Sequence, residues 1–174
     1  MKNKCVFIIG PESSGSKLIA KVCSHALGIS DFKAWDGGAW NDSGTHKVCH
    51  RSLPYGKNPK FPDVSSWIKE HEEEYDLYFI LTTRDITISH LSRYQRWRKP
   101  FSQSATESQT AKNIMLEVMH GDIPYFIWSY ESFMFLGADY LQNLYQFLGV
   151  ESDFMPELRD ANAGKVRKRK FGLF

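Results

Sequence analysis

The stretch Ile8–Ala20, IIGPESSGSKLIA, leads from an apolar run through a loop of serine and glycine into an amphipathic run. A Walker A loop reads G-x-x-x-x-G-K-[ST], whereas Gly10 to Lys17 reads GPESSGSK, with the lysine one position late. In a strand, loop and helix of this kind, backbone N–H groups and the helix dipole favour an anion at one place. The stretch therefore predicts an anion-binding loop, with an ordinary Ser/Gly turn as the structural alternative.

The altered end of the loop bears on the choice of anion. In a Walker loop the lysine reaches the nucleotide phosphates, and the Ser or Thr after it holds Mg²⁺. Here Ser16 has the lysine position and Lys17 has the metal-ligand position, and an ammonium group cannot bind Mg²⁺. The histidines also lack a spacing typical of metal sites. The loop therefore favours a phosphate ligand bound without a metal.

The rest of the chain predicts strands that alternate with helices. Such alternation is typical of an α/β fold of three layers (αβα) with a mostly parallel central sheet, whose ligands bind outside the carboxyl ends of the strands. Residues 30–45 and 100–110 are expected to be irregular. We expect strands at 4–10, 46–54, 76–84 and 123–131, and helices at 17–28, 64–75, 85–97, 107–120 and 132–148.

Composition limits the class of protein. The chain has 174 residues, 42% of them apolar and 24% charged, which predicts one globular domain over residues 1–174. A net charge of +2 gives no general case for binding nucleic acid or membranes. Three cysteines without a C-x-x-C spacing argue against disulfides and zinc, and the apolar run near the amino terminus is too short for a signal peptide. These features predict a cytoplasmic protein.

Four segments, taken together, resemble the sulfotransferase family. GPESSGSKL is similar to the family's 5′-phosphosulfate loop, P-[KR]-S-G-T-T-[WL], and matches it at Ser14, Gly15, Ser16 and Leu18. CHRSLP resembles the second-strand motif K-[ST]-H-L-P, and the segment 130–150 resembles the family's YE-D-L and FLG elements. The matches occur in the family's order and span residues 8 to about 150.

The fourth segment contains Arg84 and Ser92, which have the spacing of the family's arginine and serine for the donor's 3′-phosphate. A guanidinium at the carboxyl end of a strand, beside a helix start, is also a physically sensible phosphate ligand. The structural alternative is that Arg84 pairs with Asp85 or Glu131.

The resemblance implies a P-loop NTPase-like sulfotransferase fold in a small member of bacterial or phage type. It implies the donor 3′-phosphoadenosine 5′-phosphosulfate, transfer of the sulfuryl group to a hydroxyl or amine, and no metal. The acceptor is unknown, with carbohydrate among the candidates. The donor-binding residues that it implies are Ser13, Ser14, Gly15, Ser16, Lys17, Arg84 and Ser92, with Arg167, Lys168 and Arg169 as candidates in the basic tail.

The sequence departs from the family at two catalytic positions. Ser13 replaces the Lys or Arg of the loop, so Lys17 becomes the candidate for the leaving-group cation. The family's strand histidine aligns with Ser52, and His50 lies two residues earlier on the same face of the strand. An ordinary histidine pKa of about 6.5 suits a general base. We therefore predict His50, Lys17 and Ser52 as the catalytic set, with a packed structural histidine as the alternative.

Aromatic residues and cations outside these motifs admit two interpretations. The segment SRYQRWRK, Ser92 to Lys99, would suit nucleic acid, but on a helix Arg93, Arg96 and Trp97 favour an ordinary amphipathic surface. Trp35 and Trp40 are candidates for acceptor contacts or for core packing. The basic tail either closes over the 3′-phosphate or is a solvated or nucleic-acid-binding segment.

Two other functions remain open at this stage. A P-loop kinase or NTPase would bind ATP with magnesium. A non-catalytic nucleotide- or polyanion-binding protein of the same fold would fit the changes at Ser13 and Ser52. In each case we expect a nucleotide partner, and neither a membrane nor nucleic acid.

Overall fold

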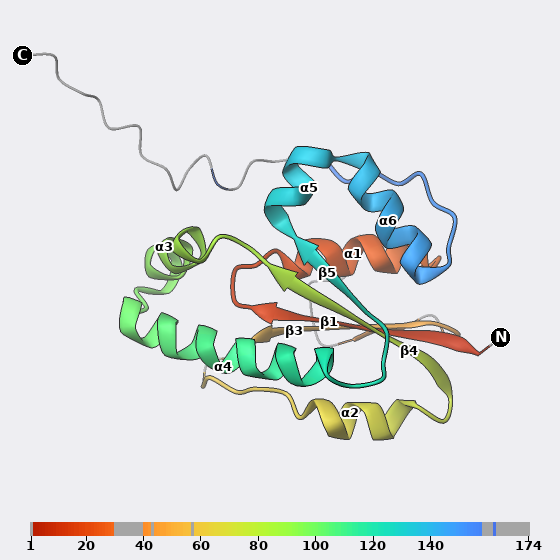
Figure 1. Cartoon of the computed structure of the whole chain (residues 1–174), viewed down its shortest axis with the longest axis horizontal. Coiled ribbons are helices and arrows are strands. Elements are labelled where there is room, and N and C mark those ends of the chain that lie inside the picture. The colour runs from red at the N-terminus through yellow and green to blue at the C-terminus, as the bar shows by residue number, and fades with distance from the viewer. Residues whose placement is uncertain (1, 30–39, 43, 57, 158–161, 163–174) are drawn as a thin grey trace, which may run out of the picture.

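The computed structural model describes residues 2–29, 40–42, 44–56, 58–157 and 162. Its centre is a five-stranded sheet in the order β2-β3-β1-β4-β5 (Figure 1). The pairs β3·β1, β1·β4 and β4·β5 are parallel, and the edge strand β2 is antiparallel to β3. The predicted α/β fold with a mostly parallel sheet is therefore confirmed. The strands are β1 (Asn3–Pro11), β2 (Trp40–Asp42), β3 (Lys47–Leu53), β4 (Tyr75–Thr83) and β5 (Tyr125–Ser129).

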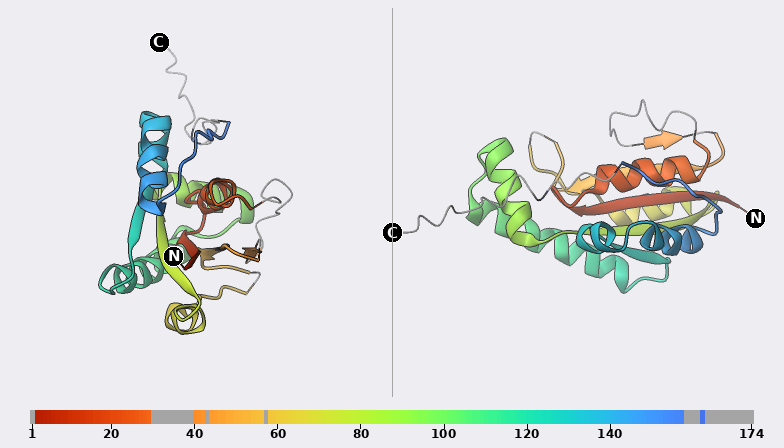
Figure 2. Two further views of the ribbon diagram at one scale, coloured as in Figure 1. Left: turned by 90° about the vertical axis from the view of Figure 1, so that its right-hand side faces the viewer. Right: turned by 90° about the horizontal axis from the view of Figure 1, so that it is seen from above.

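The helices cover both faces of the sheet. Helices α1, α5 and α6 lie on one face and α2 and α4 on the other, whereas α3 lies beyond the strand ends to which the arrowheads point (Figures 1 and 2). The helices are α1 (Ser16–Ala26), α2 (Val64–His71), α3 (Ile86–Trp97), α4 (Phe101–Met119), α5 (Tyr130–Leu136) and α6 (Ala138–Leu148).

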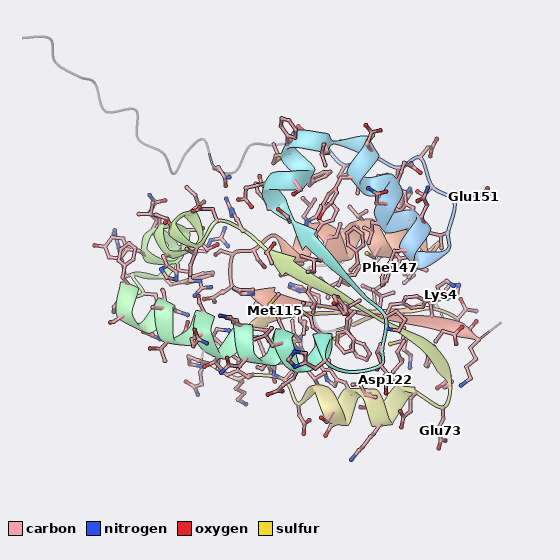
Figure 3. All side chains as sticks on the ribbon, viewed as in Figure 1. Lys4, Glu73, Met115, Asp122, Phe147 and Glu151 are labelled. Atoms are coloured by element: carbon pink, nitrogen blue, oxygen red, sulfur yellow. The ribbon has the colours of Figure 1, made fainter. Side chains whose placement is uncertain are left out.

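The middle strand β1 is buried on both faces, which explains its continuous apolar sequence. Val6 and Ile8 join the apolar cluster under α1 and α6, and Phe7 joins the cluster under α2 and α4. Figure 3 labels one member of each outer layer, Phe147 on α6 and Met115 on α4, on opposite sides of the sheet. Burying side chains of this size stabilises the fold by about 1.5–3 kcal/mol each.

The expected irregular segment at residues 100–110 is wrong, because α4 already begins at Phe101. Its first turns bury polar side chains, Ser104 and Glu107, rather than apolar ones. The Glu107 carboxylate accepts from Lys99, and the Ser104 backbone carbonyl accepts from Arg93, both cations from the preceding segment. A polar buried face does not appear in a pattern of apolar residues, so the beginning of the helix was not predicted.

Three other boundaries also differ from expectation. The helix expected over 132–148 is two helices, because Gly137 has a non-helical backbone with φ 57° and ψ −124°. The helix expected to reach Tyr75 ends at His71, and Tyr75 begins β4. Residues 40–42, within the segment expected to be irregular, form the short strand β2.

At the outer edge of the sheet, one side chain hydrogen-bonds two backbone groups of β5. The Tyr140 hydroxyl accepts a hydrogen bond from the Ser129 backbone N–H at 3.0 Å and donates one to the Ile127 carbonyl at 2.8 Å. Both backbone groups lie on the side of β5 that faces away from β4. A side chain of α6 therefore satisfies part of an open sheet edge.

Cys5, Cys23 and Cys49 are free and buried, and burial raises the pKa of the Cys23 and Cys49 thiols. Across the described ranges, none of the helices combines the length and the apolar character needed to cross a bilayer.

Candidate functional site

The loop between β1 and α1 is held in a tight, partly left-handed path. The Ser14 N–H donates to the Pro11 carbonyl at 3.0 Å, and the backbone has φ 71° at Ser13 and 91° at Gly15. Such angles strain a residue with a side chain and are ordinary for glycine. The strain at Ser13 marks the loop as a site whose conformation is imposed by its surroundings.

The end of β1, just before the loop, lies very close to β4. A Cβ atom placed on Gly10 would lie 2.1 Å from Thr82 Oγ1 and 2.3 Å from the Thr82 carbonyl oxygen. The Thr82 hydroxyl donates to the Ile9 carbonyl at 3.3 Å, so Ser14 Oγ, at 2.6 Å, is the donor to Thr82 Oγ1. Ser14 is predicted to bind the donor. In the structure its hydroxyl is hydrogen-bonded to Thr82 on β4, so its side chain stabilises the loop.

The first turn of α1 has no side-chain cap. Gly15 is its N-cap residue, and the helix leaves the N–H groups of its first turn directed out of its start. By contrast, the side chains of Asp63, Asp85 and Ser129 cap α2, α3 and α5. An uncapped helix start beside a glycine- and serine-rich loop suits an external anion.

A cavity of about 600 Å³ opens at this helix start. It lies at the carboxyl ends of β1, β3 and β4, where we expected ligands to bind. Parallel pairing explains part of this arrangement, because Ile8 is paired with His50 and Gly10 with Ser52. The cavity brings together the predicted site residues Ser13, Gly15, Ser16, Lys17, His50, Ser52, Arg84 and Ser92.

His50 lies within hydrogen-bond distance of the loop. Its Nε2 atom is 2.9 Å from Ser16 Oγ, and Ser16 occupies the position at which a Walker loop has its lysine. A neutral imidazole can accept the Ser16 hydroxyl proton at Nε2 or donate to Ser16 from it. The contact fixes the orientation of the ring against the anion-binding loop.

Arg84 joins β4 to the loop. Its Nη1 donates to the Ser13 carbonyl at 3.0 Å, and its guanidinium lies 4.6 Å from the Tyr130 ring centroid. Its Nε donates to Asn162 Oδ1 at 3.0 Å, and Nη2 donates to the same oxygen. The Nε and Nη2 donors of Arg84 thus converge on one oxygen, and this same edge of the guanidinium can bind two oxygens of a phosphate or carboxylate.

The alternative partners considered for Arg84 are used differently. Asp85 caps α3, since its carboxylate accepts from the Ile88 N–H at 2.8 Å. Glu131 accepts from the backbone N–H of Asp85 at 3.1 Å. The two carboxylates thus complete backbone hydrogen bonds at the start of α3.

Arg93 does not lie on an amphipathic surface as expected, because its side chain is 0% exposed. It donates to the Glu12 carbonyl at 3.0 Å and to the Ser104 carbonyl at 3.1 Å. Burial lowers the pKa of Arg93, and the nearby carboxylates of Glu12 and Glu107 oppose that effect. Arg93 therefore ties the loop to α4. Its neighbours Arg96 and Trp97 are exposed and line the cavity.

Lys99 completes this support with two carboxylates. Its Nζ lies 2.8 Å from Glu12 Oε2 and 2.7 Å from Glu107 Oε2. Burial alone would lower the pKa of Lys99, but hydrogen bonds and charge from the two carboxylates outweigh it and raise the pKa above its usual value. The ammonium therefore stays charged at neutral pH and holds Glu12 beside the cavity.

A smaller cavity of about 270 Å³ adjoins the first through Gly15 and Arg84. Apolar and aromatic side chains dominate its walls, as in sites that take flat organic groups. Its other lining residues are Leu18, Tyr130, Phe133, Met134 and Glu157. The combined site therefore offers anion ligands at the loop and at Arg84, with an apolar recess between them.

Several lining residues were not predicted from the sequence. Tyr130 directly follows β5 at the carboxyl edge of the sheet, and this position was a usable signal. Arg51 lies in β3 within the CHRSLP segment, which we interpreted through His50 and Ser52, and Tyr55 lies just after that strand. Glu12, within the loop, also lines the cavity and was not predicted as a site residue.

Some predicted residues lie outside the described part of the chain. These are Arg167, Lys168, Arg169 and Trp35. Trp40 belongs to β2, for which the structure describes the backbone alone. Within the described ranges, no group of three or more His, Cys, Asp or Glu residues is arranged to hold a metal ion.

No protein-family model matches this sequence, and no curated protein matches it. The assignment of a function therefore depends on the geometry of the site and on the short motifs in the sequence.

Proposed function

We propose that the protein is a sulfotransferase that moves a sulfuryl group from 3′-phosphoadenosine 5′-phosphosulfate to a hydroxyl or amine acceptor. One observation carries the proposal. A single cavity gathers the uncapped start of α1, the pair Arg84 and Ser92, and His50. The donor has two anionic ends joined by an adenosine, and the cavity has two cationic or N–H-rich positions.

The donor's 5′-phosphosulfate fits the loop from Ser13 to Lys17, where N–H groups and one ammonium favour an anion. The 3′-phosphate fits Arg84, whose fork now holds the amide oxygen of Asn162. Ser92, 5% exposed, lines the same cavity from α3. The adjoining apolar recess suits the adenine base.

The chemical step needs a base, a positioned donor and charge stabilisation at the leaving group. The acceptor oxygen attacks sulfur in line, forming a new S–O bond while its proton passes to His50. The bond from sulfur to the bridging oxygen breaks, and its electron pair leaves with the phosphate of adenosine 3′,5′-bisphosphate. Lys17 and the first-turn N–H groups of α1 stabilise that charge.

His50 has a ready orientation for this role. Its contact with Ser16 at 2.9 Å holds the ring at the edge of the loop to which we assign the phosphosulfate. To accept a proton, Nε2 exchanges the Ser16 hydroxyl for the hydroxyl of the acceptor. Ser52, on the same strand, lines the cavity one step further toward its carboxyl end.

Calorimetric titration tests the proposal. We expect adenosine 3′,5′-bisphosphate to bind without a metal, and ATP to bind weakly with or without Mg²⁺. Magnesium-dependent ATP binding with no bisphosphate signal would instead identify a P-loop kinase or NTPase. Bisphosphate binding without sulfate transfer to any hydroxyl or amine in an acceptor screen would favour a non-catalytic nucleotide-binding protein.

A further inference from the structure

The cavity contains two cations beyond the two that the proposed function assigns to the donor. Its lining cations are Lys17, Arg51, Arg84 and Arg96. Among the described lining residues, Glu12 is the one carboxylate, and Lys99 already holds it at 2.8 Å. The cationic side chains therefore face a space whose own negative charge is neutralised.

Arg51 and Arg96, the two lining cations not assigned to the donor, each lie over an aromatic ring. The Arg51 guanidinium lies 4.8 Å from the Tyr55 ring centroid, and the Arg96 guanidinium lies 5.2 Å from that of Trp97. In the described part of the chain, neither arginine forms an ion pair. An aromatic ring behind a guanidinium holds its plane while leaving its N–H donors at the edge for a ligand.

Arg51 also lies beside the proposed base. It follows His50 in the chain, and its Nη1 donates to the His50 carbonyl at 3.3 Å. Arg96 reaches the same cavity from α3, one helical turn after Ser92. An acceptor whose hydroxyl approaches His50 would therefore pass the two arginines.

We propose that the acceptor carries an oxyanion of its own, a carboxylate, phosphate or sulfate, which Arg51 and Arg96 bind while its hydroxyl meets His50. This inference rests on the proposed function, because it assigns Lys17 and Arg84 to the donor and leaves Arg51 and Arg96 for the acceptor. Bidentate guanidinium contacts favour planar or tetrahedral oxyanions over neutral polar groups.

Matched sugar probes test the inference. The protein is first saturated with adenosine 3′,5′-bisphosphate, so that the donor site is filled, and is then titrated by ligand-observed NMR. The probes are methyl β-glucoside, methyl β-glucuronide and glucose 6-phosphate. We expect at least one charged probe to bind about 10-fold or more tightly than the neutral one. The ratio between the two charged probes separates carboxylate from phosphate recognition.

Three variants locate the effect. Arg51→Gln and Arg96→Gln should each reduce the preference for the charged probe to about 3-fold or less, with bisphosphate affinity retained. Arg98→Gln is the matched control, because Arg98 stacks on Tyr94 at 5.8 Å in the same way but does not line the cavity. It should keep the full preference.

The outcomes separate this inference from the proposed function. Equal binding of neutral and charged probes, no binding of any charged probe, or an unchanged preference in Arg51→Gln and Arg96→Gln would overturn it. A failure of the proposed function shows instead as absent bisphosphate binding to the wild type. In that case the probes are titrated against the unfilled protein, and the two arginine variants still decide whether an oxyanion binds there.

Discussion

Helices α1 and α2 pack on opposite faces of the same sheet, yet their first turns are completed in different ways. At α2 the Asp63 carboxylate accepts from the Ser66 N–H at 3.0 Å and from its hydroxyl at 2.8 Å. At α1 no side chain caps the first turn, and the helix starts at a cavity. A helix that carries its own anion is closed to ligands, whereas one without it has a place for a ligand's anion.

The largest effect should come from Gly10, near the end of β1, which lies very close to Thr82 on β4. In Gly10→Ala the new Cβ would meet the backbone and hydroxyl of Thr82, so we expect the free energy of unfolding to fall by about 3 kcal/mol. Bisphosphate binding should be lost as the loop shifts. Denaturant unfolding and calorimetry measure both.

Gly121→Ala is the matched control, since the nearest atom to its added Cβ, the Val118 carbonyl oxygen, lies 3.4 Å away. It should leave both measurements nearly unchanged. An equally stable and active Gly10→Ala variant would show that the loop does not need this close approach.

The second prediction concerns His50 beside the open helix start. His50→Gln should lower the rate of sulfate transfer by about 10²–10³-fold, because the step loses its base. Glutamine still reaches Ser16, so bisphosphate affinity should stay within about 3-fold. Single-turnover rates together with calorimetry separate these effects, and an undiminished rate would reassign His50 to a structural role.

The third prediction concerns the guanidinium of Arg84, which lies beside the same loop. Arg84→Met should weaken bisphosphate binding by about 100-fold, because a charge-assisted bidentate contact is lost. Arg84→Lys keeps the charge but not the fork, so it should fall between the wild type and Arg84→Met. If all three proteins bind alike, Arg84 does not contact the ligand.

The capped start of α2 predicts a smaller effect, on stability rather than on binding. Asp63→Ala removes the cap of α2 and should lower the melting temperature by about 2–4 °C. Because the cap lies outside the cavity, bisphosphate affinity should remain unchanged. Thermal unfolding with and without bisphosphate tests both parts, and a loss of affinity would mean that the two helix starts are coupled.

The smallest effect should appear at the opposite end of β1. His46 Nδ1 accepts from the Lys4 N–H at 3.0 Å, and burial, with a contribution from the charge of Lys4, lowers its pKa. Its stabilising contribution is therefore complete above the unfolded pKa of about 6.5 and is lost as pH falls through the lower folded value. Between pH 7.5 and 5.5 we expect the melting temperature to fall by about 1–2 °C.

His46→Asn keeps an acceptor for Lys4 but does not titrate, so its melting temperature should change less with pH. Part of the pH dependence of the melting temperature should remain, because burial and the charge of Arg93 lower the pKa of His90 as well. An identical slope in the variant and the wild type would exclude His46 as the cause.

The sequence predicted those features of the fold that depend on apolar periodicity. The strand β1, the loop after it and the strand β4 were expected almost at their observed bounds, because two apolar faces mark a central parallel strand. The start of α4 was missed because its buried face is polar and is completed by Arg93 and Lys99 from elsewhere in the chain. The break at Gly137 was missed because apolar periodicity continues across it.

The candidate site was predictable where a motif and a strand end coincide. The loop from Ser13 to Lys17, His50 and Arg84 meet in one cavity because parallel strands end at the same edge of the sheet. Arg51 reaches the cavity from β3, next to His50, and Tyr130 lies against Arg84 just after β5. Both positions lie near strand ends, but their part in the cavity depends on contacts between distant segments.

The Tyr140 hydroxyl on the outer edge of β5 has a consequence for association between molecules. An exposed edge strand invites a strand from a second chain to extend the sheet. Here an incoming strand would first have to displace the tyrosine from the Ile127 carbonyl and the Ser129 N–H. The two hydrogen bonds of Tyr140 therefore oppose edge-to-edge aggregation. Tyr140→Phe would remove both hydrogen bonds while preserving the ring.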